Sequence, residues 1–214
     1  MIIHDCEQRS AEWYALRSGI PTASEFSKLV TSKGEPSKSM KEYAITLAGE
    51  KFAGQPLDTW EGNTWTERGR ELEEEALRLY EFAHSFTVDS VGFVTTDDKD
   101  AGCSPDGLVG TDGMVEVKCL KSENHIKAIM YHQKHGTCPT TYVQQTQGQM
   151  MICERNWCDL IFFHPVLPVL TIRQEPIAEV QSGIIQAIKD VLKERDDVLA
   201  ALQEHQSPTQ QAAE

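Results

Sequence analysis

The chain has 214 residues, of which 40% are hydrophobic and 25% are charged, a composition typical of a globular protein with one buried core. Its net charge of −13 argues against the broadly basic surface of most DNA-binding domains. The acidic excess is uneven, since residues 1–60 carry 7 basic and 8 acidic side chains whereas residues 61–130 carry 7 and 15. If the partner is DNA, it should therefore enter near the first third of the chain.

The termini and the cysteines indicate a cytoplasmic protein. The start, Met1 to Cys6, lacks the basic residues and the apolar run of a signal peptide. The most apolar stretch, residues 160–170, is interrupted by proline and is too short to span a bilayer. None of the 6 cysteines forms a Cys-x-x-Cys pair, so a zinc ribbon is disfavoured and free buried thiols are expected.

Helical patterns fill the first part of the chain. Thr22-Ala23-Ser24-Glu25 has the spacing of a capping box, in which side chains at both ends of the first turn bind backbone N–H groups. The polar stretch 31–39 is expected to be a mobile loop. The helices expected in this region cover residues 10–16, 22–30, 40–53 and 64–83.

From residue 86 onward the pattern changes to alternating strands and then to mixed elements. Strands are expected over residues 86–94, 102–109, 114–119, 157–163 and 169–173, and helices over 123–135, 140–153 and 177–203. The predicted fold class is therefore α/β (α+β), with a central mixed sheet flanked by helices. We expect one domain over residues 1–204 and a disordered polar tail over 205–214.

The strongest chemical signal is Ser104-Pro105-Asp106-Gly107 followed closely by Glu116-Val117-Lys118. Side chains alternate along a strand, so Glu116 and Lys118 should share one face while Val117 points into the core. Asp106 lies across a tight turn and can reach the same face. Two neighbouring carboxylates repel unless a cation joins them, and oxygen ligands suit Mg²⁺ or Mn²⁺. The competing interpretation is a hairpin with ordinary exposed charges.

Glu73 is a third acidic candidate. It adjoins the apolar stripe of the helix expected over 64–83, so it should point partly inward, whereas Glu71, Glu74 and Glu75 should face solvent. An inward acidic side chain is a candidate metal ligand or a partner of one. A glutamate at a helix edge with no such role is an equally good interpretation of the pattern alone.

Several motifs together resemble those of the lambda exonuclease and YqaJ-type viral recombinase family. They stand in the family order and cover about residues 10–155. The similar segments are Trp13–Glu25, Gly69–Glu73, Ala101–Leu108, Glu116–Cys119 and Tyr142–Gln147. The resemblance implies a restriction-endonuclease-like PD-(D/E)xK core and a phage or prophage origin.

The resemblance also implies roles for particular residues. Asp106, Glu116, Glu73 and the Val117 carbonyl would bind Mg²⁺, for which Mn²⁺ would substitute. Lys118 would position the nucleophilic water, and Gln145 would support the catalytic groups.

Arg17, Ser24 and Ser104 would hold a terminal 5′ phosphate by the same resemblance. The residues alone favour a surface charge at Arg17 and helix capping at Ser24. In the loop 31–39, Lys33 and Lys38 are candidate DNA contacts, with a plain linker as the alternative. Trp60 and Trp65 are candidates for stacking on bases, although core packing is the more common role of tryptophan.

The implied function is a 5′→3′ exonuclease on linear double-stranded DNA with 5′-phosphorylated ends. It would release mononucleotides and leave 3′ single strands for recombination. The implied partners are a single-strand annealing protein and two further copies of the chain in a homotrimeric ring, with no membrane. The alternatives are an endonuclease built on the same core, which the core cannot distinguish, and an inactive DNA-binding relative.

Overall fold

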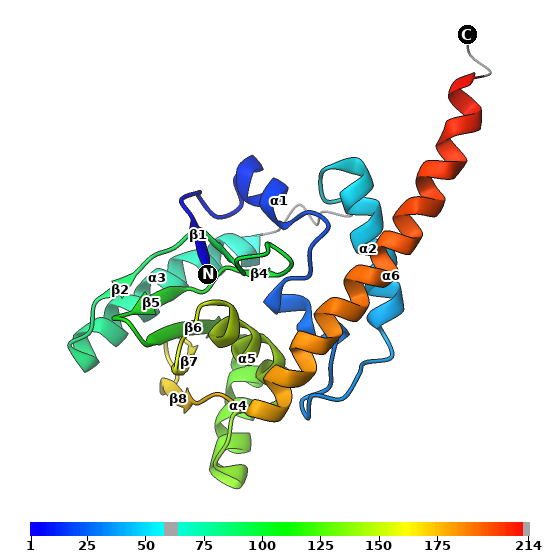
Figure 1. The fold of residues 1–214 in the computed structure, drawn as a ribbon. Coiled ribbons are helices and arrows are strands. Elements are labelled where there is room, and N and C mark those ends of the chain that lie inside the picture. The colour runs from blue at the N-terminus through cyan, green and yellow to red at the C-terminus, as the bar shows by residue number, and fades with distance from the viewer. Residues whose placement is uncertain (58–63, 212–214) are drawn as a thin grey trace.

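The computed structural model describes residues 1–57 and 64–211, and within these ranges it leaves the side chains of 64–68, 70 and 206–211 undefined. The described chain forms a five-stranded mixed sheet, flanked by helices, and a smaller three-stranded sheet (Figure 1). This arrangement confirms the expected fold class. The elements are β1 (Ile2–His4), α1 (Ala11–Arg17), the 3-10 helix η1 (Ala23–Lys28), α2 (Met40–Ala53), α3 (Thr64–His84), β2 (Val88–Asp89), β3 (Phe93–Thr95), β4 (Gly102–Cys103), β5 (Gly107–Val109), β6 (Gly113–Cys119), α4 (Ser122–His135), the 3-10 helix η2 (Thr140–Tyr142), α5 (Val143–Ile152), β7 (Trp157–Phe163), β8 (Leu170–Gln174) and α6 (Ala178–Gln211).

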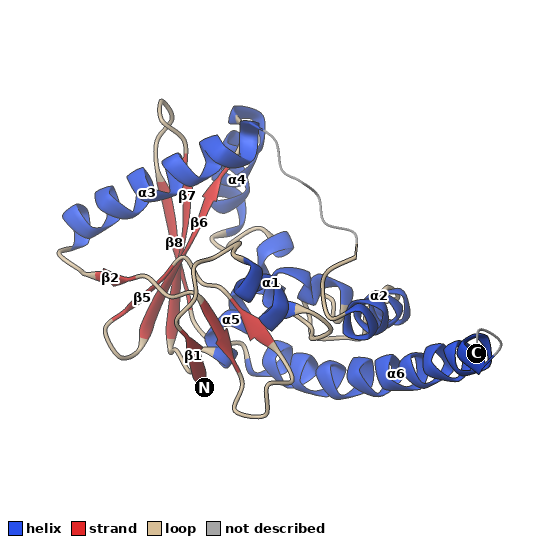
Figure 2. Ribbon diagram, turned by 90° about the horizontal axis from the view of Figure 1, so that it is seen from above, coloured by secondary structure: helices blue, strands red, loops and turns tan. Residues whose placement is uncertain are grey.

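The larger sheet has the strand order β2-β5-β6-β7-β8. Its neighbours are antiparallel except β6 and β7, which run parallel in register from Gly113 opposite Trp157 to Cys119 opposite Phe163. Parallel neighbours need a long crossover, and here α4, η2 and α5 provide it. Figure 2 shows α3 on one side of this sheet and α5 and α6 on the other.

Two segments expected to be single strands are each divided between the two sheets. The predicted strand 86–94 becomes β2 and β3, and the predicted strand 102–109 becomes β4 and β5. At the first break the backbone of Gly92 lies so close to the segment before α1 that a Cβ would collide with it. At the second break Pro105 has no backbone N–H to continue a ladder. Asp106 follows this break directly, just before β5.

The alternation predicted for β6 is confirmed. Val115 and Val117 pack with Tyr80 of α3 in one buried cluster, whereas Met114 belongs to the core on the opposite face. Glu116 lies on that opposite face and is bonded to side chains of α5. Strand β6 is therefore buried on both sides, and its polar residues are enclosed by a helix rather than exposed.

The loop 31–39 is packed, in contrast to the mobile loop that we expected. The backbones of Gly34 and Gly183 approach each other so closely that a Cβ on Gly183 would meet the Gly34 carbonyl, which fixes the loop against α6. Val30 and Pro36 form an antiparallel bridge at the base of the loop. Helix α6 packs along α2 and continues to Gln211, past the boundary expected at residue 204 (Figure 1). Residues 212–214 lie outside the described chain.

The remaining expectations concern the membrane and the cysteines. None of the helices in the described part of the chain is both long and apolar enough to cross a bilayer. All six cysteines are free; Cys6 and Cys119 are half-buried and the other four are buried.

A buried aspartate, Asp159, connects α3 to the sheet. Asp159 of β7 is 3% exposed and accepts hydrogen bonds from the Tyr80 hydroxyl at 2.7 Å and from Arg173 Nε and Nη2 at 2.8 and 2.7 Å. We expect Asp159→Ala to lower the free energy of unfolding by about 2 kcal/mol, because Tyr80 and Arg173 both lose their acceptor. Thermal melting should show a fall of about 6 °C. Asp97→Ala removes only an exposed ion pair with the N-terminus and should change little; equal shifts would contradict this role.

Candidate active site

Asp106 is held against the backbone of β6. Its Oδ2 accepts a hydrogen bond of 2.6 Å from the Val117 N–H, which places the carboxylate beside the Val117 main chain as the strand register requires. Poor solvation raises the pKa of Asp106 well above its ordinary value, and the charges of Glu116 and Glu73 raise it further. The Val117 N–H and Lys118 lower the pKa but do not offset the increase. The ionised carboxylate is therefore short of positive charge.

Glu116 is the most enclosed acidic group of the site, at 4% exposure. Its Oε1 accepts hydrogen bonds from Lys118 Nζ at 2.7 Å and from Gln145 Nε2 at 2.6 Å, and its Oε2 accepts one from Gln149 Nε2 at 2.8 Å. Every donor is a side chain on β6 or α5. These bonds fix the carboxylate in one orientation, which is what a buried charge requires.

Lys118 joins β6 to α5. Besides Glu116, its Nζ donates to Gln145 Oε1 at 3.0 Å. Burial lowers the pKa of Lys118, but Glu116 and Asp106 raise it by more, so the net direction is upward. Lys118 is therefore a fixed cation at neutral pH, suited to holding a water or an anion rather than to removing a proton.

Helix α5 presents glutamines on two sides. Gln145 and Gln149 are one turn apart and both bond Glu116, as expected for positions i and i+4. Gln147 faces away, where it donates to the Glu175 carbonyl and accepts from the Ile177 N–H. The Gln145-x-Gln147 element therefore supplies one residue to the site and one to the connection into α6. Gln149 was missed by the sequence analysis, although the i, i+4 spacing could have indicated it.

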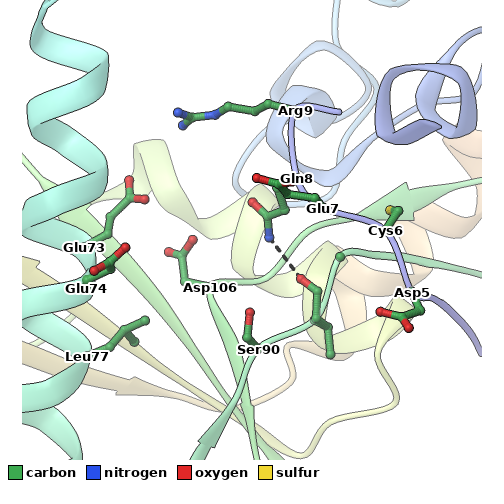
Figure 3. A pocket seen from close by; sticks show the side chains of 12 residues that line it. Asp5, Cys6, Glu7, Gln8, Arg9, Glu73, Glu74, Leu77, Ser90 and Asp106 are labelled. Atoms are coloured by element: carbon green, nitrogen blue, oxygen red, sulfur yellow. Dashed lines mark hydrogen bonds between the residues drawn. The ribbon is translucent and has the colours of Figure 1, made fainter. Parts of the chain in front are cut away.

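Glu73 and Asp106 line one cavity of about 330 Å³. Figure 3 shows both carboxylates directed into this cavity, Glu73 from α3 and Asp106 from the segment before β5. Glu73 is half-buried as predicted, and Glu71 and Glu75 are exposed. Glu74 is exposed as predicted and also borders the same cavity.

The carboxylates do not form a preassembled metal cage. Within the described residues, no three His, Cys, Asp or Glu side chains lie close enough together to hold a metal ion. The donor set nevertheless fits a hard divalent cation. The negative charge of the Asp106 carboxylate is poorly balanced by positive groups, and Glu116 and Glu73 are the acidic neighbours that raise its pKa. A cation beside Asp106 would remove the repulsion.

A second cavity, of about 190 Å³, contains all three residues predicted to hold a terminal phosphate, Arg17, Ser24 and Ser104. Gln145 and Gln149 also line it, and Gln8 and Arg9 line both cavities. The cavity of Asp106 and the cavity of Arg17 are therefore neighbours.

Arg17 is a cation without an acidic partner among the described residues. Its guanidinium stacks on the Trp13 ring at 4.1 Å, and its Nη2 lies 3.4 Å from Thr22 Oγ1. Burial lowers the pKa of Arg17, with nearby acidic and phenolic groups opposing this change. A partly desolvated guanidinium attracts an anion strongly, and its planar fork suits phosphate.

The serines of this cavity are held by neighbouring side chains. Ser104 Oγ accepts from Trp13 Nε1 at 2.7 Å and donates to the Gly92 carbonyl at 2.8 Å. Ser24 lies on η1, with its Oγ 3.4 Å from Thr22 Oγ1. The capping box predicted here is wrong, because Thr22 makes no side-chain cap and η1 is a 3-10 helix. The Thr22 hydroxyl faces Arg17 and Ser24 instead.

The remaining candidates lie elsewhere. Lys33 and Lys38 are exposed on the packed loop and border neither cavity. Trp60 and the side chain of Trp65 lie outside the described residues.

The comparisons with known proteins identify relatives. Residues 12–156 match the sequence profile of the YqaJ-like viral recombinase domain. The alkaline exonuclease LHK-Exo from Laribacter hongkongensis is similar at 29% identity and a TM-score of 0.80, over 94% of this chain and 100% of that chain. The structure of LHK-Exo in complex with dAMP is similar at 28% identity and a TM-score of 0.80, over the same shares of the two chains. A phage-related exonuclease from Haemophilus somnus 129PT shares the fold at 17% identity and a TM-score of 0.65, over 86% of this chain and 96% of that chain. No curated protein sequence matches.

Proposed function

The chain belongs to the YqaJ-like viral recombinase domain family, and from this premise we propose that it is a metal-dependent exonuclease that digests linear double-stranded DNA from its 5′ ends. Its fold and its relatives are those of an exonuclease-type nuclease. The observation that carries the proposal is the pair of adjoining cavities. One is lined by the carboxylates of Asp106 and Glu73, and the other contains the partly desolvated guanidinium of Arg17. An enzyme that holds a terminal phosphate and cuts the adjacent phosphodiester bond needs two adjoining cavities of this kind.

Asp106, Glu116 and Glu73 are the side chains that would hold Mg²⁺ or Mn²⁺, with the Val117 carbonyl as a further ligand. A bound divalent cation would lower the pKa of a coordinated water and neutralise charge on the phosphate. Gln145 and Gln149 keep Glu116 oriented, and Glu116 Oε2, which accepts a single hydrogen bond, retains a lone pair for a ligand. Lys118 remains cationic and holds the attacking water or the charge that develops on the phosphate.

Arg17, Ser24 and Ser104 would set the polarity by binding the 5′ phosphate. The terminal nucleotide would then span the boundary between the two cavities, and hydrolysis would release a 5′ mononucleotide. The relative LHK-Exo in complex with dAMP supports a product of this class.

Linear duplex labelled separately at its 5′ and 3′ ends tests the proposal, together with a covalently closed circle. With Mg²⁺ we expect early release of the 5′ label as mononucleotide, late release of the 3′ label and an intact circle. Chelation should stop digestion. Cutting of the circle would indicate an endonuclease instead. Binding of DNA without release of either label would indicate an inactive relative.

We further propose that the protein acts as a homotrimeric ring. With a net charge of −13, broad electrostatic attraction cannot keep the chain on DNA between cleavages, whereas a closed ring retains the duplex by topology. Light scattering should give three times the 24.0 kDa of one chain, and digestion should continue after excess competitor DNA is added. A processive monomer would refute the topological argument, and a dimer or tetramer would refute only the count.

The partner class that follows from a 3′ single-stranded product is a single-strand annealing protein.

A further inference from the structure

Arg9 occupies the boundary between the two cavities. It lines both the cavity of Asp106 and Glu73 and the cavity of Arg17. In Figure 3 its side chain extends across the mouth of the larger cavity, toward the side where Glu73 projects from α3. Arg9 is exposed and forms no ion pair with another described residue.

The larger cavity is otherwise acidic. Among its described lining residues Arg9 is the single cation, beside five carboxylates. Lys118, which is not part of this lining, is already bonded to Glu116 and Gln145. A phosphodiester entering this cavity would therefore find one uncommitted positive side chain among the residues whose side chains the structure describes.

The backbone that presents Arg9 is strained. Its φ is +70°, a left-handed conformation that non-glycine residues rarely adopt. The Ser10 N–H bonds the Glu7 carbonyl at 3.1 Å, which makes Arg9 the third residue of a turn, where glycine is favoured when φ is positive. An arginine at a position suited to glycine is an outlier that motivates a search for a function of its side chain.

We propose that Arg9 binds the scissile phosphodiester at the mouth of the carboxylate cavity, while Arg17 binds the terminal phosphate. This inference rests on the proposed exonuclease function and assigns the two phosphates of the terminal nucleotide to different arginines. Arg9 supplies a planar fork that holds the non-bridging oxygens. It offsets the repulsion between the phosphodiester and the surrounding carboxylates.

Arg9→Gly is the sharpest test, because glycine fits the backbone and should leave the melting temperature nearly unchanged. We expect kcat/KM on 5′-phosphorylated duplex to fall by about ten- to hundredfold, with Arg9→Lys recovering part of the loss. The preference for 5′-phosphate over 5′-hydroxyl ends should stay at the parent value. Lys99→Gly is the matched control, since Lys99 is also exposed, basic and left-handed at φ +56° but lines neither cavity.

A neutral probe separates phosphate binding from a structural role. A 5′-phosphorylated duplex with a methylphosphonate at its first internucleotide bond lacks the charge that Arg9 would bind. When this duplex is used as an inhibitor of the digestion of unmodified 5′-phosphorylated duplex, its inhibition constant should be nearly equal for the parent and Arg9→Gly. The inference is overturned if Arg9→Gly keeps the kcat/KM of the parent, or if it loses the preference for 5′-phosphate ends. It is also overturned if the inhibition constant of the methylphosphonate duplex rises in Arg9→Gly by as large a factor as kcat/KM falls. A parent that fails to digest linear duplex would instead reject the proposed function.

Discussion

Asp106→Asn should reduce metal-dependent digestion of linear duplex by about a thousandfold or more, because several kcal/mol of charge stabilisation depend on the cation that this carboxylate would hold. Glu116→Gln should have an effect of the same order. Lys118→Ala should retain metal binding and lose rate by about a hundredfold. The measurement is single-turnover release of the first nucleotide, with metal affinity determined by calorimetry. Asp98→Asn changes an exposed carboxylate that lines neither cavity and serves as the control.

Asp106→Asn should stabilise the metal-free protein. The pKa of Asp106 is raised in the folded state, so folding favours the protonated carboxyl, and the ionised form destabilises the fold above the ordinary carboxyl range. Asn retains an acceptor for the Val117 N–H without the charge. At neutral pH, without metal, Asp106→Asn should gain about 1 kcal/mol, and this difference should vanish as the pH falls below about 4.

Added Mg²⁺ should raise the melting temperature of the parent but not that of Asp106→Asn. Near-normal digestion by Asp106→Asn, with an unchanged response to Mg²⁺, would reject the carboxylate site.

Local patterns predicted the parts of the site that depend on one element. The period of β6 was enough to place Glu116 and Lys118 on one face and Val117 on the other, because alternation is a property of any strand. Inward placement of Glu73 followed in the same way from the apolar stripe of α3. The residues that complete the environment of these groups come from distant elements. Gln149 reaches Glu116 only because α5 crosses the face of β6.

The errors have the same origin. The segments 86–94 and 102–109 have the composition of strands, but their division depends on which strands they pair with. In the first segment β2 pairs with β5 and β3 with β1. In the second segment β4 pairs with β3, and β5 pairs with β2 and β6. Thr22 has the residue type and the spacing of a capping box, yet its hydroxyl lies beside Arg17 and Ser24. The polar loop 31–39 is packed because two glycines allow close approach to α6. Tertiary contacts overrode local preference in each case.

Arg17→Ala should remove the distinction between 5′-phosphorylated and 5′-hydroxyl ends. We expect kcat/KM on 5′-phosphorylated duplex to fall by about a hundredfold, because a charge-assisted bidentate contact in a partly desolvated cavity is lost. The slower digestion of 5′-hydroxyl duplex should change little, since that substrate offers Arg17 no terminal phosphate. Arg17→Lys should recover only part of the preference, because an ammonium cannot reproduce the planar fork that stacks on Trp13.

The 5′-hydroxyl substrate is also the control for folding. Arg17 packs on Trp13, which donates to Ser104, so its loss could disturb the whole cavity. A general disturbance would lower the rates on both substrates together, whereas loss of phosphate recognition lowers only one. Ser104→Ala should narrow the preference in the same direction by a smaller factor, and Lys189→Ala, which removes an exposed charge on α6, should leave both rates unchanged. Equal losses on the two ends in Arg17→Ala would show that this cavity does not read the 5′ phosphate, and the polarity of digestion would then need another origin.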